Sequence, residues 1–283
     1  GVHWRGFVGV AQTYADQKNG PRVDAYQAFV REQSCARGAP NVDGCDVTGV
    51  PNECGGLTFS GSGSLGRVFA PDLVAFWWPF EGGRLPYLYF SAGEVRMEGQ
   101  TSTLTLPPQE LKSSDGIVAF DPLETIRVSA MGADVPSFIS DIQMPSRAVF
   151  SMPDLAASTL VLPNDPLEVA WTADGDVGTV EVWSAFAFTP DSRTVEMALV
   201  HCSAPLRAAR LTAPPLPIRR DYGIGGPERV LAVRVQRSEI LQVDGWVVQV
   251  TAASFESGPV KIVASSMDAA PPTHIHDAMP EPR

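Results

Sequence analysis

Short strands separated by turn residues fill most of the sequence after residue 56. Residues 124–129 alternate between polar and apolar side chains, as expected of a strand with one buried face. Residues 167–171 place three large apolar side chains on one face, and an Asp-Gly-Asp turn follows. The chain's 25 glycines and 25 prolines fit this pattern, because antiparallel sheets need many tight turns. The sequence therefore predicts a mainly β protein built of antiparallel sheets.

Two β-rich domains joined near residue 152 are expected from the length of 283 residues and from the turn residues at the join. Residues 1–152 form the N-terminal domain, with a cysteine-containing loop at 35–54. Residues 153–267 hold the more regular series of strands, which predicts an immunoglobulin-like sandwich. Residues 268–283 contain four prolines and are expected to form an extended arm.

One short helix is predicted at residues 21–33. Pro21 suits a first helical position because its missing N–H would have no partner there. Val23, Tyr26, Phe29 and Val30 then recur at a spacing that places them on one helical face. The prediction is thus a single N-terminal helix in an otherwise β-rich chain.

Four cysteines indicate an oxidising compartment: Cys35, Cys45, Cys54 and Cys202. Three of them lie in a segment with little apolar surface to hold it, and disulfides would supply the missing constraint. The sequence does not choose among the pairings. Free thiols or a zinc site are the alternatives, although the segment has no C-x2-C pair and no nearby histidine. We expect export to the cell surface, the periplasm or the extracellular space, and a chain that begins at Gly1 suits a processed protein.

The charge of the chain argues against several partners. The formal net charge is −11 and no segment is basic, which argues against nucleic-acid binding. No run of about 18 apolar residues occurs, so no transmembrane segment is predicted. The glycine-rich run at 61–66 matches neither a nucleophile elbow nor a phosphate-binding loop. No cofactor is predicted.

Several strand segments carry a resemblance to a known family. They are Phe90-Ser-Ala-Gly-Glu-Val95, residues 126–138, Gln143-Met-Pro145, residues 167–172 and residues 199–203. In this order they resemble uncharacterised exported two-domain lipoproteins of predatory and social soil bacteria, over most of residues 25–265. The resemblance implies export, a β-rich fold and surface display, and it carries no catalytic residues. Such proteins bear a lipid-linked cysteine at the mature N-terminus, where this chain has Gly1.

Two weak metal-binding patterns occur. His274 and His276 point the same way on an extended strand, with Asp277 beside them, and a solvated or docked arm is the alternative. Asp174 and Asp176 carry the alternating carboxylates of a calcium turn but lack the later carboxylates that complete such a loop. A hairpin turn without metal is the alternative there.

Large aromatic side chains gather between residues 76 and 90. Alternation along a strand would send neighbouring rings to opposite faces, which is more than one small core accepts. These rings could pack between domains, contact another chain or form a platform for a sugar ring. The candidates are Phe76, Trp77, Trp78, Phe80, Tyr87 and Tyr89.

These observations favour a non-catalytic exported protein that acts as a structural, assembly or binding component at the cell surface. Its expected partners are other protein subunits or copies of itself. An extracellular hydrolase acting on polymers is the first alternative, because carboxylates from several loops can form an active site. A carbohydrate-binding module that uses the aromatic cluster to bind a glycan is the second.

Overall fold

The computed structural model describes residues 2–14, 21–33, 54–61, 90–108, 113–115, 119–155, 159–162, 166–188, 195–214, 228–256 and 260–264. In these ranges the only helical piece is a three-residue 3-10 turn, η1 (Leu206–Ala208). The strands are β1 (Val2–Thr13), β2 (Arg22–Gln33), β3 (Cys54–Gly61), β4 (Val95–Glu98), β5 (Thr103–Leu106), β6 (Ser113–Asp115), β7 (Thr125–Ala130), β8 (Phe138–Gln143), β9 (Ala148–Met152), β10 (Thr159–Leu162), β11 (Leu167–Ala173), β12 (Thr179–Phe188), β13 (Val195–Pro205), β14 (Arg210–Ala213), β15 (Glu228–Val243), β16 (Trp246–Phe255) and β17 (Val260–Ala264).

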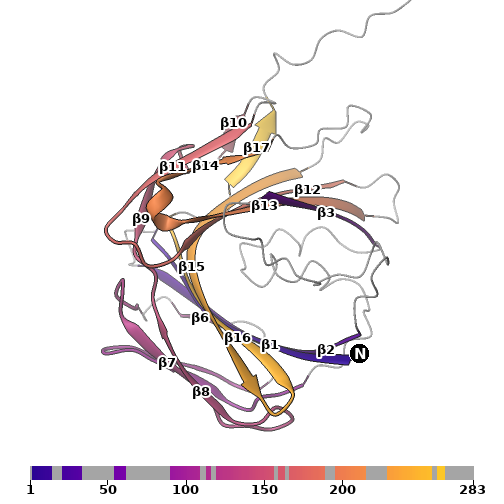
Figure 1. Cartoon of the computed structure of the whole chain (residues 1–283), viewed down its shortest axis with the longest axis vertical. Helices are drawn as coiled ribbons and strands as arrows, with labels where there is room; N and C mark the ends of the chain where they lie inside the picture. Colours follow the sequence, from indigo (N-terminus) through magenta and orange to yellow (C-terminus); the bar gives the residue numbers. More distant parts are fainter. Residues whose placement is uncertain are drawn as a thin grey trace, which may run out of the picture.

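Ten strands share one large sheet, which curves through the described part of the molecule (Figure 1). Its path runs in the order β3-β13-β12-β15-β16-β1-β2-β6, and β17 pairs with β15 and with β10. Two smaller sheets, β5-β4-β7-β8 and β14-β11-β9, complete the fold. Most strand pairs are antiparallel, although β1 runs parallel to β16 and β10 parallel to β17. The predicted mainly β class with antiparallel sheets is therefore confirmed.

The long strand β15 lies in the middle of the large sheet and pairs with a different strand along each half of its length. Residues 228–236 pair with β12, and residues 235–243 pair with β16. In Figure 1 this strand runs from the level of β12 down to the level of β7 and β8. A single strand thus connects the two layered regions of the molecule.

The first core lies between β1, β2 and β16 of the large sheet and the sheet β5-β4-β7-β8. Every second residue of the strands enters it, as the pleat of a β-strand requires. Trp246 stands at the centre of a ring cluster, with ring centroids 5.1 Å from Trp4, 5.5 Å from Phe90 and 6.0 Å from Phe29. Gly6 leaves the space for the Phe29 ring, since a Cβ at this position would lie 2.5 Å from the ring edge. Other buried members include Val8, Val10, Val23, Ala25, Met97, Leu104, Ile126, Val128, Phe138, Ile142, Val248 and Val250.

The second core lies between β12, β13 and β15 of the large sheet and the sheet β14-β11-β9. Trp171 of β11 is buried there against Phe150 of β9, and its indole Nε1 donates a 2.7 Å hydrogen bond to the carbonyl oxygen of Leu206. That bond satisfies a polar group that would otherwise be costly to bury. Other buried members include Val169, Val180, Val182, Cys202, Ala204, Leu231, Val233 and Val235.

The helix predicted at 21–33 is wrong, because residues 22–33 form strand β2. This strand pairs with β1 over its whole length. Val23, Ala25 and Phe29 are buried in the first core at intervals of two and four residues, which is the period of a strand. The helical spacing of Val23, Tyr26 and Phe29 is thus outweighed by tertiary pairing, which commonly overrides local preference.

Strands from both sides of residue 152 share the same sheets. β16 pairs with β1, and β9 pairs with β11. The peptide bond between Met152 and Pro153, at the expected join, is cis. The division into domains at this position stays a prediction.

Candidate functional site

A disulfide joins the edge strand β3 to β13. Cys54 and Cys202 lie directly opposite each other in the antiparallel pair, with their Cα atoms 4.2 Å apart. Cys202 is fully buried in the second core, whereas Cys54 is exposed. The other two candidate cysteines, Cys35 and Cys45, lie outside the described residues. The disulfide therefore fixes one end of the large sheet at a sequence separation of 148.

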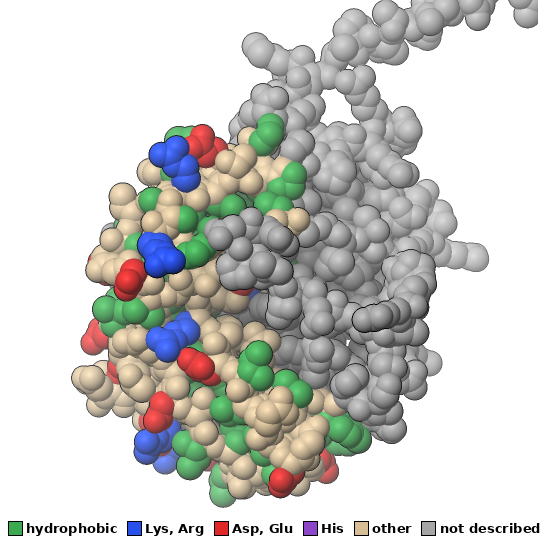
Figure 2. Space-filling view, viewed as in Figure 1, with side chains coloured by type: hydrophobic (Ala, Val, Ile, Leu, Met, Phe, Trp, Pro, Cys, Tyr) green, Lys and Arg blue, Asp and Glu red, His purple; other side chains and the backbone are tan. Residues whose placement is uncertain are grey.

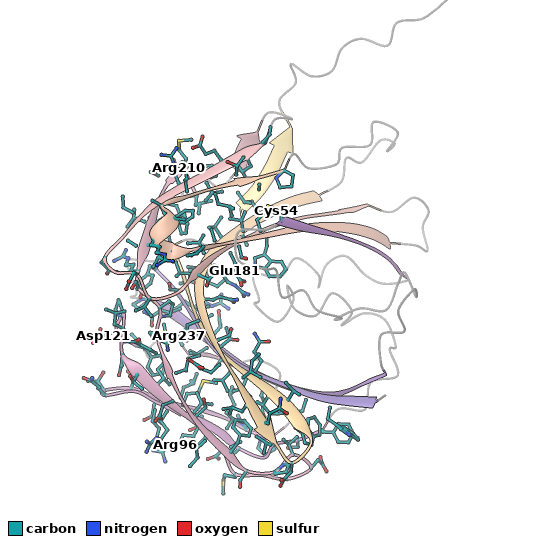
Figure 3. The ribbon with its side chains drawn as sticks, in the orientation of Figure 1. Cys54, Arg96, Asp121, Glu181, Arg210 and Arg237 are labelled. Carbon is teal, nitrogen blue, oxygen red and sulfur yellow. A yellow bond between two sulfur atoms is a disulfide. The ribbon has the colours of Figure 1, made fainter. Side chains whose placement is uncertain are left out.

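A buried ion pair lies on the face of the large sheet opposite to the second core. Glu181 of β12 is directly opposite Arg234 of β15, and the guanidinium Nη2 and Nε donate to Glu181 Oε2 at 2.8 and 3.2 Å. Only 1% of the Arg234 side chain and 7% of the Glu181 side chain are exposed. Trp183 Nε1 donates to the same carboxylate oxygen at 3.3 Å. Figure 3 shows Glu181 in the interior of the molecule, far from the outer surface where Arg96 lies.

Two further polar groups surround this pair. Gln236 Nε2 donates to Oε1, the other oxygen of the Glu181 carboxylate. Gln236 Oε1 and the hydroxyl oxygen of Ser203, which stands opposite Glu181 on β13, are buried and have no hydrogen-bond partner among the described residues. A polar group buried without a partner is unfavourable, so this cluster depends on close packing around it.

The outer face of the sheet β5-β4-β7-β8, which we call the outer sheet face, carries a second group of charged and apolar side chains. The strand registers arrange them in three rows across the sheet. The rows are Glu98, Arg127 and Asp141; Arg96, Ser129 and Ile139; and Glu94, Met131 and Ser137. Met131 and Ile139 are 74% and 67% exposed, more than any other large apolar side chain described.

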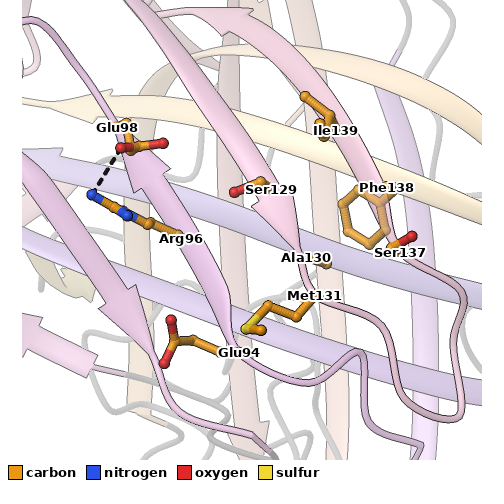
Figure 4. A pocket seen from close by; sticks show the side chains of 9 residues that line it. All are labelled: Glu94, Arg96, Glu98, Ser129, Ala130, Met131, Ser137, Phe138 and Ile139. Carbon is orange, nitrogen blue, oxygen red and sulfur yellow. Dashed lines mark ion pairs between the residues drawn. The ribbon is translucent and has the colours of Figure 1, made fainter.

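A shallow depression of about 630 Å³ lies on this face (Figure 4). Arg96 and Glu98 form an ion pair at 2.9 Å along its side, and Ile139 and Met131 line it from two neighbouring strands. The complete lining is Glu94, Arg96, Glu98, Ser129, Ala130, Met131, Ser137, Phe138 and Ile139. The depression is thus apolar in part and bordered by the Arg96–Glu98 ion pair and by Glu94.

The exposed ion pair in the first row perturbs both of its members. Arg127 Nε donates to Asp141 Oδ1 at 3.0 Å. This hydrogen bond holds the pKa of Asp141 below its ordinary value and raises the pKa of Arg127. Arg127 and Asp141 are therefore both charged throughout the neutral range. Over the surface visible in Figure 2, cationic and anionic side chains also lie near one another.

The predicted aromatic and metal sites lie largely outside the described residues. This holds for the aromatic candidates Phe76, Trp77, Trp78, Phe80, Tyr87 and Tyr89 and for the metal candidates His274, His276 and Asp277. Asp174 and Asp176 are exposed in the turn between β11 and β12. No group of three or more metal-ligating side chains occurs within the described ranges. In the same ranges, no helix has the length and apolar character needed to cross a bilayer.

Comparison with known proteins gives no relative. No family model, no curated protein and no solved structure matches the chain. The site must therefore be interpreted from its own geometry.

Neither the buried pair nor the outer sheet face was identified from the sequence. Strand alternation predicts that Ile126 and Val128 face inward and that Arg127 and Ser129 face outward. It does not give the register that places Asp141 opposite Arg127. The exposed apolar pair does leave a signal, because Met131 and Ile139 fall at outward positions where polar residues are usual.

Proposed function

We propose that this protein is a non-catalytic exported component of the cell surface that acts in assembly or binding, with other subunits or copies of itself as partners. The observation that carries the proposal is the outer sheet face, where two exposed apolar side chains lie among ion-paired charges. Such a mixture of apolar and paired polar groups is typical of protein contacts. Arg96 is paired with Glu98 and Arg127 with Asp141, so the exposed apolar side chains of this face lie beside neutralised charges.

The disulfide supports export. A bond between Cys54 and Cys202 forms and persists in an oxidising compartment and is rare in the cytosol. We further propose that the second core, with β14-β11-β9 facing β12, β13 and β15, belongs to an immunoglobulin-like sandwich. Domains of this kind often display binding surfaces outside the cell.

Surface digestion of intact cells tests the proposal. Trypsin added to cells that produce the protein natively should release its peptides, and the peptides that contain Cys54 and Cys202 should be recovered linked under non-reducing mass spectrometry. A cytosolic protein that stays undigested serves as the control for cell integrity. Recovery of the chain only after lysis, with both thiols reduced, would contradict export and surface display together.

A further inference from the structure

We propose that the outer sheet face binds the same face of a second copy of this chain, around a two-fold axis that runs along the strands between β7 and β8. The inference rests on the proposed function, because it names the partner of that surface. It follows from the order of charges on the face, from the position of the exposed apolar pair and from the area of the face.

The charges on β7 and β8 are self-complementary about this axis. Rotation about an axis between the two strands places β7 of one copy over β8 of the other. Because the axis is parallel to the strands, each row keeps its position along them. Arg127 then faces Asp141 of the second copy, and Asp141 faces the second Arg127. Because these two residues are directly opposite in one chain, at 3.0 Å between Nε and Oδ1, they can exchange partners without changing height along the strands. An isologous contact requires this reciprocal matching of one patch with itself.

The apolar side chains gather around the same axis. Ile139 is directly opposite Ser129, and Met131 lies two residues after Ser129, just past the end of β7, which makes Met131 and Ile139 diagonal neighbours. The rotation brings the second copy's Ile139 over Ser129 and beside Met131. Four exposed apolar side chains, two from each copy, would then cover each other and leave water.

The outer sheet face is closer to electrical neutrality than the chain as a whole. Two copies with a formal net charge of −11 each repel each other over most orientations. On the outer side of β7 and β8, the two strands that face the second copy, the charges are one cation, Arg127, and one anion, Asp141. Approach through this nearly balanced face therefore meets less repulsion than the average charge of the chain implies.

The area of the face predicts a weak contact. The axis between β7 and β8 brings only these two strands over the second copy, and two strands spaced about 4.8 Å apart and about six residues long at about 3.3 Å per residue cover roughly 200 Å². Stable complexes bury about 800 Å² per partner, so the contact through these two strands is about a quarter of the usual size. We expect dissociation at low concentration and association where many copies are held at one surface, since local concentration replaces affinity there.

A charge exchange tests the contact. Arg127→Asp leaves an anion at both facing positions, 127 and 141, of each copy, and Asp141→Arg leaves a cation at both, so that each variant repels itself across the proposed axis. An equimolar mixture restores two attractive pairs between unlike copies, although both variants remain net acidic. Sedimentation equilibrium up to about 1 mM, a range that covers weak interfaces, should show association of the wild type. It should show a rise of about tenfold or more in the dissociation constant for each variant alone, and recovery in the mixture.

Matched controls separate folding from contact. Ile139→Glu should weaken association, whereas Ile240→Glu, which adds the same charge at a residue 64% exposed on β15, should not. Circular dichroism of each variant checks that the strands remain folded. A wild type that stays monomeric at the highest concentration, or a mixture that associates no better than either variant alone, would overturn the inference. Either result leaves surface digestion of intact cells unchanged, so failure of this contact is distinguishable from failure of the proposed function.

Discussion

Two ion pairs of the same chemistry occupy opposite environments in this molecule. Glu181 and Arg234 join β12 to β15, and Arg127 and Asp141 join β7 to β8, in each case across directly opposite residues. Their closest N–O distances are 2.8 and 3.0 Å. The first pair is almost completely buried, whereas 60% of the Arg127 side chain and 51% of the Asp141 side chain are exposed.

The difference shows that geometry alone does not set the role of an ion pair. Water screens the exposed pair and competes for its hydrogen bonds, so its members can exchange partners at little cost. The buried pair has lost its hydration, and each charge depends on the other and on Trp183 and Gln236. We therefore expect the buried pair to govern folding and the exposed pair to govern contacts.

Arg234→Met should have the largest effect on stability. The substitution leaves the Glu181 carboxylate in the interior without its guanidinium partner, and removing one member of a buried pair lowers the free energy of unfolding by about 3–5 kcal/mol. Urea unfolding followed by tryptophan fluorescence measures this loss.

The double variant Glu181→Gln with Arg234→Met is the matched control. It removes both charges and keeps an acceptor for Trp183 Nε1, so it should recover at least half of the loss. A double variant no more stable than Arg234→Met alone would show that the pair contributes through side-chain packing and not through charge.

Removal of the disulfide should have the second largest effect on stability. Cys54→Ser with Cys202→Ala frees the edge strand β3 from β13, and loss of such a bond lowers the free energy of unfolding by about 2–4 kcal/mol because it releases the unfolded chain from a long loop. The alanine at 202 suits the buried side of the bond and the serine at 54 the exposed side. Comparison of urea midpoints for the oxidised wild type and the double variant gives the value. A difference of less than about 0.5 kcal/mol would mean that β3 is held by its pairing with β13 and not by the bond.

The local sequence pattern predicts where strands and turns lie better than it predicts which strands pair with each other. The alternation at 124–129 corresponds to β7, and the Asp-Gly-Asp sequence at 174–176 lies in the turn between β11 and β12. Both features depend on neighbouring residues alone. The parallel pairing of β1 with β16 joins the two ends of the described chain and leaves no local signal, because its register depends on everything folded between them.

The burial of Glu181 and Arg234 leaves no signal in the sequence for a similar reason. Residues 233–235 alternate as Val, Arg and Val, which normally indicates a strand with Arg exposed to water. Arg234 is instead buried, and so are Val233 and Val235 on the opposite face of the strand. Such double burial is a property of the layers and cannot be inferred from one strand. The pairing of Cys54 with Cys202 likewise follows from the register of β3 and β13, which cysteine spacing does not encode.

Asp141→Asn should have the smallest effect on stability, and its pH dependence sharpens the contrast with Arg234. Because the hydrogen bond from Arg127 lowers the folded-state pKa of Asp141 below its ordinary value of 3.8, the stabilisation is present above that value and is lost as the pH falls through the lowered pKa. At neutral pH the melting temperature should fall by no more than about 2 °C, and the difference from the wild type should disappear in about 1 M salt or below the lowered pKa. Thermal melts at pH 7 and in acid, each with and without salt, measure this. A large loss that salt does not reduce would place Asp141 in the same class as Glu181 and would contradict the division of roles between the two pairs.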